Sequence, residues 1–499
     1  MATLKEKTVS GVFWIGMAKT SMQFMLVAVL FILARLLSEA DFGIIAMAGI
    51  ITVAIGMVNE RGLGTAIIQK KNIPDSQLST MFWASLAFGA LLFGVGFGIS
   101  FPLAGFYNEQ LIKPVFIIMS SGFFIGAFGI VQKALLTKEM AFKKLAIIEM
   151  CAVMVSGITA IILAMFRFGV WSLVVLALLR DLISVVLLWL SSPWRPALHF
   201  SRKEFNELLS FSASVLGNDV ALYLVTNADI TIIGKVLGKA MLGYYSLALN
   251  LVKMPVTRLS AIVARVVFPA FSELQDDLLA FKKSFLRSVT FISLITFPLL
   301  AGLAVFSREF ITVFLGEKWL PMTLPLIILI PMAMLKSVGS IKGSVLMACG
   351  KPEIEFKWNL VYLLPLIAAV LFGTRFGISG AAAAFTILYI LTFPVIQHIT
   401  NKQINVTMKE FGKALSVSTF STAMMAFVGI IVKLIFRIVL NINDLWTLTA
   451  GILLSVVTYY FAFRLLDKTL LNEFLNLFKN LKKKQPKVDL HLSEVTINS

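Results

Sequence analysis

The residues of this chain that could do chemistry are ionisable side chains lying inside long apolar runs. An ionisable side chain in hydrocarbon costs ~2.5–3.5 kcal/mol on insertion scales, so by default it faces the interior of a helix bundle or a water-filled cavity. We expect the cations to project into one cavity and to attract an anionic substrate. They are Lys19, Lys253, Arg258 and Lys336.

A structural interpretation competes with this one. Each cation could pair with a buried carboxylate, or extend its side chain so that the charge reaches the membrane interface. For Arg258, such an extension to the interface and a place in the cavity are equally good interpretations. Lys253 is the strongest functional candidate, because Pro255 follows it and frees backbone groups that only a cavity or a partner can satisfy. The carboxylates available for pairing are Asp181, Asp219 and Glu149.

Two carboxylates lie close to these cations in the sequence. Asp219 and Asp229 belong to the apolar run that precedes Lys253, and either could bind a coupling proton or Na⁺. Pairing of Asp219 with Lys253 is at least as good an interpretation. Arg180 and Asp181 are adjacent and compensate each other in charge, so we favour a structural role for them.

No arrangement of residues indicates catalysis. The longest of the outer loops expected on the side opposite to the termini, Ser307 to Leu320, holds Glu309 and Glu317, which we interpret as part of a solvated turn rather than a carboxylate pair. Two cysteines and three histidines form no metal-binding pattern, and no phosphate-binding loop is present. We therefore expect neither an enzyme nor a bound metal, with H⁺ or Na⁺ as the only candidate cofactor.

The elements that must position these residues are membrane-spanning helices. The chain is 59% hydrophobic and 14% charged with a mean hydropathy of +0.91, far from the composition of a soluble domain. Runs of about 17 to 25 apolar residues suit helices that cross ~30 Å of hydrocarbon. We expect an all-α polytopic protein with fourteen spans, at 11–34, 42–58, 79–104, 111–132, 144–166, 169–191, 209–233, 240–262, 284–306, 321–347, 357–373, 377–397, 411–432 and 445–466.

The positive charges sort to one side of the predicted membrane. With the amino terminus in the cytoplasm, the inner segments carry 29 of the 44 lysines and arginines and the outer segments carry 10. The positive-inside rule then places both termini in the cytoplasm. This distribution explains the net charge of +18 without a nucleic-acid partner.

The chain repeats itself at a distance of 200 residues. Ile32 to Ala48 aligns without a gap on Ile232 to Ala248, and Arg167-Phe168-Gly169 recurs as Arg375-Phe376-Gly377. Six spans per half give both halves the same topology, so we expect two six-helix lobes related by a parallel repeat, with the substrate site between them. The expected division is 1–203 for the N-lobe, 204–402 for the C-lobe, 403–468 for two extra spans and 469–499 for a cytoplasmic amphipathic helix with a basic tail.

The ordered set of motifs resembles the polysaccharide-exporter branch of the multidrug/oligosaccharidyl-lipid/polysaccharide (MOP) flippase superfamily. The likeness is greatest to the Wzx-like group of colanic acid and teichuronic acid exporters, and it covers nearly the whole chain. The matching stretches are LARLLSEADFGIIAMA (33–48), RGLGTAIIQKK (61–71), KALLTKEMAFKKL (133–145), NADITIIGKVLGKAMLGYYSLA (227–248), RVVFPAFSELQ (265–275) and FLGEKW (314–319).

The resemblance implies a flippase of the bacterial cytoplasmic membrane that moves undecaprenyl-diphosphate-linked oligosaccharides by alternating access. It also implies that Lys19 and Lys253 lie on the spans whose cations contact the diphosphate, and that spans 13 and 14 help to accommodate the lipid tail. Expected partners are the lipid-linked oligosaccharide, membrane lipids and polysaccharide assembly machinery. Alternatives are a drug or small-cation exporter of the same superfamily, a membrane-embedded polymerase or ligase, and a structural scaffold.

Overall fold

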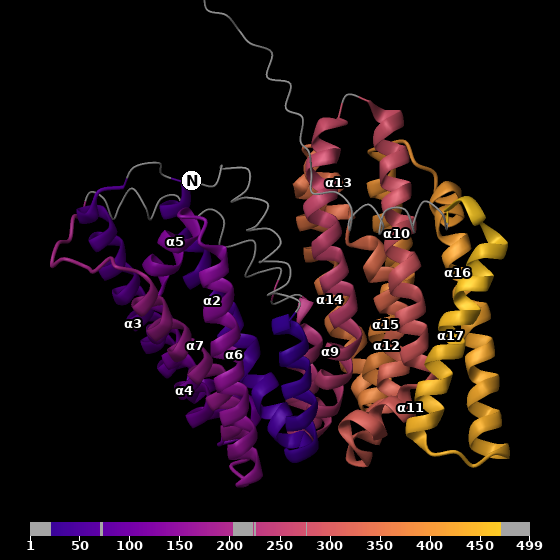
Figure 1. Ribbon diagram of the computed structural model, residues 1–499, viewed down its shortest axis with the longest axis horizontal. Helices are drawn as coiled ribbons and strands as arrows, with labels where there is room; N and C mark the ends of the chain where they lie inside the picture. The colour runs from indigo at the N-terminus through magenta and orange to yellow at the C-terminus, as the bar shows by residue number, and fades with distance from the viewer. Residues whose placement is uncertain (1–20, 70–72, 203–222, 224–225, 276, 471–499) are drawn as a thin grey trace, which may run out of the picture.

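The computed structural model describes residues 21–69, 73–202, 223, 226–275 and 277–470, and these form helices with no β-strand (Figure 1). The first is Ser21–Leu36. It is followed by α2 (Glu39–Gln69), α3 (Asp75–Tyr107), α4 (Ile112–Ala127), α5 (Ile130–Lys138), α6 (Phe142–Met165) and α7 (Val170–Ser191). Next come α9 (Ala228–Glu273), α10 (Leu278–Val305), α11 (Ser307–Phe310), the π-helix η1 (Ile311–Leu315), the 3₁₀-helix η2 (Glu317–Met322), α12 (Thr323–Gly339) and α13 (Lys342–Ala348). The last are α14 (Pro352–Thr374), α15 (Gly377–Lys402), α16 (Met408–Leu434), the π-helix η3 (Ile435–Val439) and α17 (Asp444–Leu466).

These helices make a polytopic membrane protein, as expected, but they do not reproduce the count of fourteen spans. Ten helices are long and apolar enough to cross a membrane, or eleven if the pair α4 and α5, bent by 46°, is one span. The difference has identifiable sources. The first run is described only from Ser21, most of the run at 209–233 lies outside the described residues, and α9, which carries the run at 240–262, is not among the ten.

The helices form two groups that converge at one end of the molecule and diverge toward the other (Figure 1). One group contains α2 to α7 and the other contains α9 to α15, with α16 and α17 along the outer edge of the second. The groups meet where α2 packs against α9. The arrangement is that of two helical bodies, whereas the residue boundaries given above for the lobes remain a prediction.

Both halves of the predicted repeat have the same interruptions. The first helix ends at a bend at Leu37 and Ser38, and 200 residues later α9 is broken at Gly238, where φ is 80° and ψ is 179°. Gly169 and Gly377, which end the two Arg-Phe-Gly motifs, also share positive φ values of 54° and 71°. In the second half, the chain therefore turns at Gly238, inside the repeated segment Ile232 to Ala248.

The start of α2 crosses α9 just after the break at Gly238, at what we call the crossing end. A β-carbon on Gly43 would lie 1.8 Å from the carbonyl oxygen of Lys239, and one on Gly243 would lie 1.8 Å from that of Glu39. Glycine at both positions lets the two backbones touch, as small residues do between membrane helices. An ion pair of 2.7 Å between Lys239 and Glu109 joins the groups beside this crossing.

Candidate functional site

A buried carboxylate anchors the polar cluster of the second helical group. Asp229, near the start of α9, is only 1% exposed, and its Oδ2 atom accepts a hydrogen bond of 2.7 Å from the hydroxyl of Tyr245. The two residues are sixteen positions apart on one element. They meet because the break at Gly238 turns the chain between them.

Two of the predicted cations interact with this carboxylate. The charge of Asp229 acts on both Lys253, further along α9, and Lys336 on α12, and the two lysines also act on each other. Both side chains are half-buried. In the part of the chain that the structure describes, neither ammonium group has a hydrogen bond or an ion pair.

The cluster is incomplete in its hydrogen bonding. The Oδ1 atom of Asp229 and the hydroxyl of Tyr362, on α14, are buried without a hydrogen-bond partner among the described residues, and the two groups interact electrostatically. Buried polar atoms are nearly always paired, so unpaired ones need an explanation such as a ligand, an ion or a water molecule. With Lys253 and Lys336 the cluster has one cation in excess, which suits an anion, while Asp229 suits a proton or a cation.

Three of the eight predicted site residues belong to this cluster. Asp229, Lys253 and Lys336 belong to the cluster, which is positioned by α9, α12 and α14. Lys19 and Asp219 lie outside the described residues, as does the side chain of Arg258 within α9. A single cavity shared by all four cations therefore stays a prediction.

Arg180 and Asp181 lie on α7, in the first helical group. Both are described, and their side chains form no ion pair with each other. The Oδ2 atom of Asp181 instead lies 3.4 Å from the place where a β-carbon on Gly122 of α4 would be. The structural role favoured for these two residues remains an interpretation.

The tyrosines of the cluster were not among the predicted site residues. Tyr245 belongs to the repeated segment, and its counterpart 200 residues earlier is Ile45. Comparison of the two copies therefore contained a signal for this site residue, because one copy has a hydroxyl group where the other has an apolar side chain. Tyr362 lies in an apolar run with no comparable signal.

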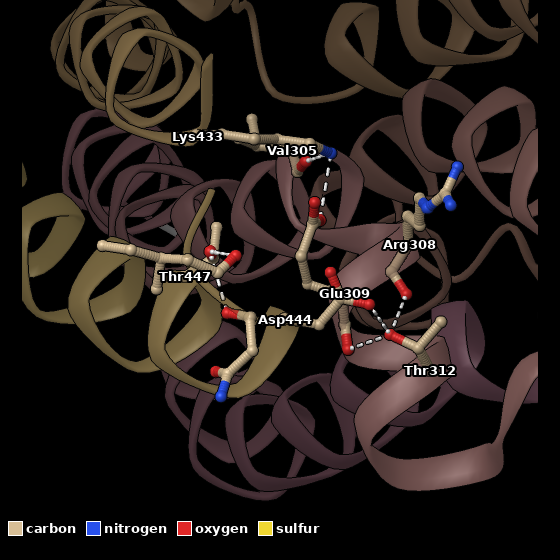
Figure 2. Close-up of polar contacts among 9 residues, drawn as sticks. Val305, Arg308, Glu309, Thr312, Lys433, Asp444 and Thr447 are labelled. Carbon is tan, nitrogen blue, oxygen red and sulfur yellow. Dashed lines mark hydrogen bonds and ion pairs between the residues drawn. The ribbon is translucent and has the colours of Figure 1, made fainter. Parts of the chain in front are cut away.

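The expectation of a solvated turn between Ser307 and Leu320 is wrong. This stretch forms α11, η1 and most of η2, and Glu309 is fully buried. Its Oε2 atom lies 3.0 Å from the Nζ atom of Lys433 on α16 (Figure 2). Lys433 neutralises the carboxylate, which makes burial of the charge tolerable. The segment is therefore an ordered part of the helical body.

Long apolar helices in two groups are those of a multi-pass membrane protein. The fold matches the solved structure of the lipid II flippase MurJ in an inward closed conformation with a TM-score of 0.72. That match covers 92% of this chain and 99% of the other at 16% identity, so it supports the fold alone.

The chain belongs to the polysaccharide biosynthesis protein family, whose model matches residues 32–324. It is 30% identical to the lipopolysaccharide biosynthesis protein WzxC of Escherichia coli (strain K12), over 78% of this chain and 80% of that protein. It is 29% identical to the teichuronic acid biosynthesis protein TuaB of Bacillus subtilis (strain 168), over 78% of this chain and 82% of that protein. These matches confirm the resemblance stated from the motifs.

Proposed function

We propose that this protein is a flippase that moves undecaprenyl-diphosphate-linked oligosaccharide repeat units across the cytoplasmic membrane for the synthesis of a surface polysaccharide. Membership of the polysaccharide biosynthesis family and the fold shared with a lipid II flippase support the class of protein. The observation that carries the substrate chemistry is the pair of lysines, Lys253 and Lys336, without an ion-pair partner among the described residues.

The chemistry of the substrate explains why such cations are useful. A diphosphate cannot enter hydrocarbon unaided, because transfer of an isolated charge into a medium of low dielectric constant is very costly. Ammonium groups held inside the helical body offset that cost with charge-assisted hydrogen bonds, while the polyprenyl chain stays in the lipid. The excess of cations over carboxylates in the cluster favours a lipid-linked anion over a cationic drug.

The buried carboxylate supplies a candidate for coupling to an ion gradient. We infer that Asp229, whose Oδ1 atom has no hydrogen-bond partner in the part of the chain that the structure describes, binds a proton or Na⁺ in one state of the transport cycle. Lys253 and Lys336 interact electrostatically with Asp229. Binding of a proton or Na⁺ to Asp229 would therefore change the attraction of the cluster for a diphosphate. Asp219 remains the second candidate for this role.

The remaining assignments follow from the same proposal. The protein acts as a transporter rather than an enzyme, in the cytoplasmic membrane of a bacterium, with both termini in the cytoplasm according to the positive-inside rule. The crossing end then faces the periplasm, because Arg35, Lys239 and Lys318 belong to the predicted outer segments. Its partners are the lipid-linked oligosaccharide, membrane lipids and the polysaccharide assembly machinery that receives the product.

The test is movement of a labelled undecaprenyl-diphosphate oligosaccharide between the leaflets of proteoliposomes. We expect Lys253→Ala to slow the parent rate about tenfold, which corresponds to ~1.4 kcal/mol of lost interaction, and Lys253→Arg to retain most of it. Lys409→Ala, which removes an exposed lysine of α16, is the matched control and leaves the rate unchanged.

Three results have distinct meanings. A rate that falls only in Lys253→Ala supports both the flippase and the role of the cluster. Equal rates in parent and variant retain the flippase and assign Lys253 to structure. An absence of movement in the parent under imposed proton and Na⁺ gradients overturns the proposed function.

A further inference from the structure

The segment Ser307–Met322, which we call the clasp segment, is held at the crossing end by the first helix, whose Val29 side chain packs against Gly157 of α6 in the first helical group. The indole of Trp319, fully buried, donates a hydrogen bond of 2.8 Å to the carbonyl oxygen of Ala34. The ammonium group of Lys318 donates to the carbonyl oxygen of Leu37 at 2.6 Å. These bonds satisfy carbonyl groups that the end of the first helix leaves open.

The π-helix within the clasp segment supplies the reciprocal contacts. Arg35, near the end of the first helix, donates to the carbonyl oxygens of Val313 and of Phe314, the latter at 3.1 Å. Both acceptors belong to η1, Ile311–Leu315. A guanidinium group has fixed donor directions, so these bonds require the backbone of η1 to hold one orientation.

The other side of the clasp segment is held by α16. The Nζ atom of Lys433 lies 3.0 Å from Oε2 of Glu309 and donates a hydrogen bond of 2.8 Å to the carbonyl oxygen of Val305 (Figure 2). Glu309 is fully buried two residues before η1 begins. The ion pair therefore holds the clasp segment a few residues before the carbonyl groups that Arg35 contacts.

A second contact comes from α17. The hydroxyl of Thr312, within η1, donates to the carboxylate of Asp444 at 2.7 Å (Figure 2). Asp444 is the first residue of α17, where a carboxylate is favoured by the helix dipole and is therefore well positioned. Both helices beyond the twofold repeat thus contact the clasp segment.

We propose that α16 and α17 brace the clasp segment, so that closure of the two helical groups at the crossing end depends on the contacts Glu309–Lys433 and Thr312–Asp444. Without them, the clasp segment would lose its polar contacts with α16 and α17, and the carbonyl groups of η1 would be held less firmly in the orientation that Arg35 needs. The proposal gives the last two helices a conformational role. It depends on no substrate and stands or falls independently of the proposed function.

The test measures how often the crossing end opens. Ala34 is fully buried beneath Trp319, so Ala34→Cys, in a background with Cys151→Ala and Cys349→Ala, reports opening through its rate of reaction with a water-soluble maleimide. The purified protein is labelled in nanodiscs, where the reagent reaches both faces. We expect Lys433→Gln to accelerate labelling about tenfold, and Thr312→Val to accelerate it about threefold.

The matched control removes a similar bond elsewhere on α16. Thr290 of α10 donates to the carbonyl oxygen of Ala414 at 3.0 Å, away from the clasp segment, so Thr290→Val should leave the labelling rate unchanged. If Lys433→Gln does not fold, Thr312→Val still tests the proposal, because the Thr312→Val substitution buries no unpaired charge. A parent rate in Thr312→Val, or an equal acceleration in Thr290→Val, overturns the proposal.

Discussion

The two copies of the repeated segment share backbone features but differ in the chemistry of their side chains. Each copy has a break before its helix and a glycine that admits the partner's carbonyl oxygen at the same offset. Their chemistry differs, because the second copy carries ionisable or hydroxyl groups where the first copy is apolar. The pairs are Val29 and Asp229, Ile45 and Tyr245, and Val53 and Lys253. The shared features close the crossing end, whereas the polar cluster belongs to one copy alone.

The largest effect should come from breaking the feature that both copies share. Gly43→Ala and Gly243→Ala each place a β-carbon 1.8 Å from a backbone oxygen, which can be relieved only if α2 and α9 move apart. We expect each variant to lose about 3 kcal/mol of stability, at the upper end of the usual cost of overpacking. The midpoint of unfolding in mixed micelles, followed by far-ultraviolet circular dichroism, measures this loss.

The control lies on the same helix. A β-carbon on Gly49 of α2 would meet nothing within 4 Å, so Gly49→Ala should leave stability unchanged or raise it slightly through helix propensity. A common loss in all three variants would show that alanine is poorly tolerated throughout α2. A loss in Gly43→Ala but not in Gly243→Ala would show that the crossing is not symmetric.

A smaller effect should separate the two breaks, which differ in backbone conformation. Gly238 has φ of 80° and ψ of 179°, a region that residues with a β-carbon rarely enter. Ser38, its counterpart, instead accepts a hydrogen bond of 3.3 Å from the backbone N–H of Asp41 and caps α2. We expect Gly238→Ser to cost about 2 kcal/mol and Ser38→Gly only a few tenths, measured by the same unfolding transition. Equal losses would contradict the distinction.

The sequence contained much of this fold because the membrane imposes simple rules. Apolar runs predicted the helices, and the offset of 200 residues predicted a twofold arrangement whose crossing at Gly43 and Gly243 the structure shows. The count of spans was less secure. The run at 240–262 lies in α9, a helix of 46 residues that is broken at Gly238 and is not among the ten candidate spans.

The candidate site was predictable where a charge stood out against an apolar background. Asp229, Lys253 and Lys336 were selected in this way, because an ionisable residue in an apolar run is energetically costly, and their assignment as a site stays a prediction. Tyr362 gave no signal, since tyrosine is an ordinary residue of membrane helices. The burial of Glu309 was not predicted, because its partner Lys433 lies far away in the sequence, on α16. The sequence does not show contacts between residues so far apart.

The smallest effect should come from the polar group that one copy has and the other lacks. Tyr245→Phe removes the donor to Oδ2 of Asp229 and leaves a buried carboxylate without a hydrogen bond among the described residues. Hydrogen bonds to charged groups contribute about 1.5 kcal/mol or somewhat more, so we expect a loss of that size in the unfolding transition. Tyr244→Phe is the neighbouring control, because the ring of Tyr244 packs edge-on against Trp319 and its hydroxyl has no hydrogen-bond partner in the described part of the chain. If both variants lose the same stability, the bond to Asp229 contributes nothing specific, and the polar cluster is held by α9, α12 and α14 alone.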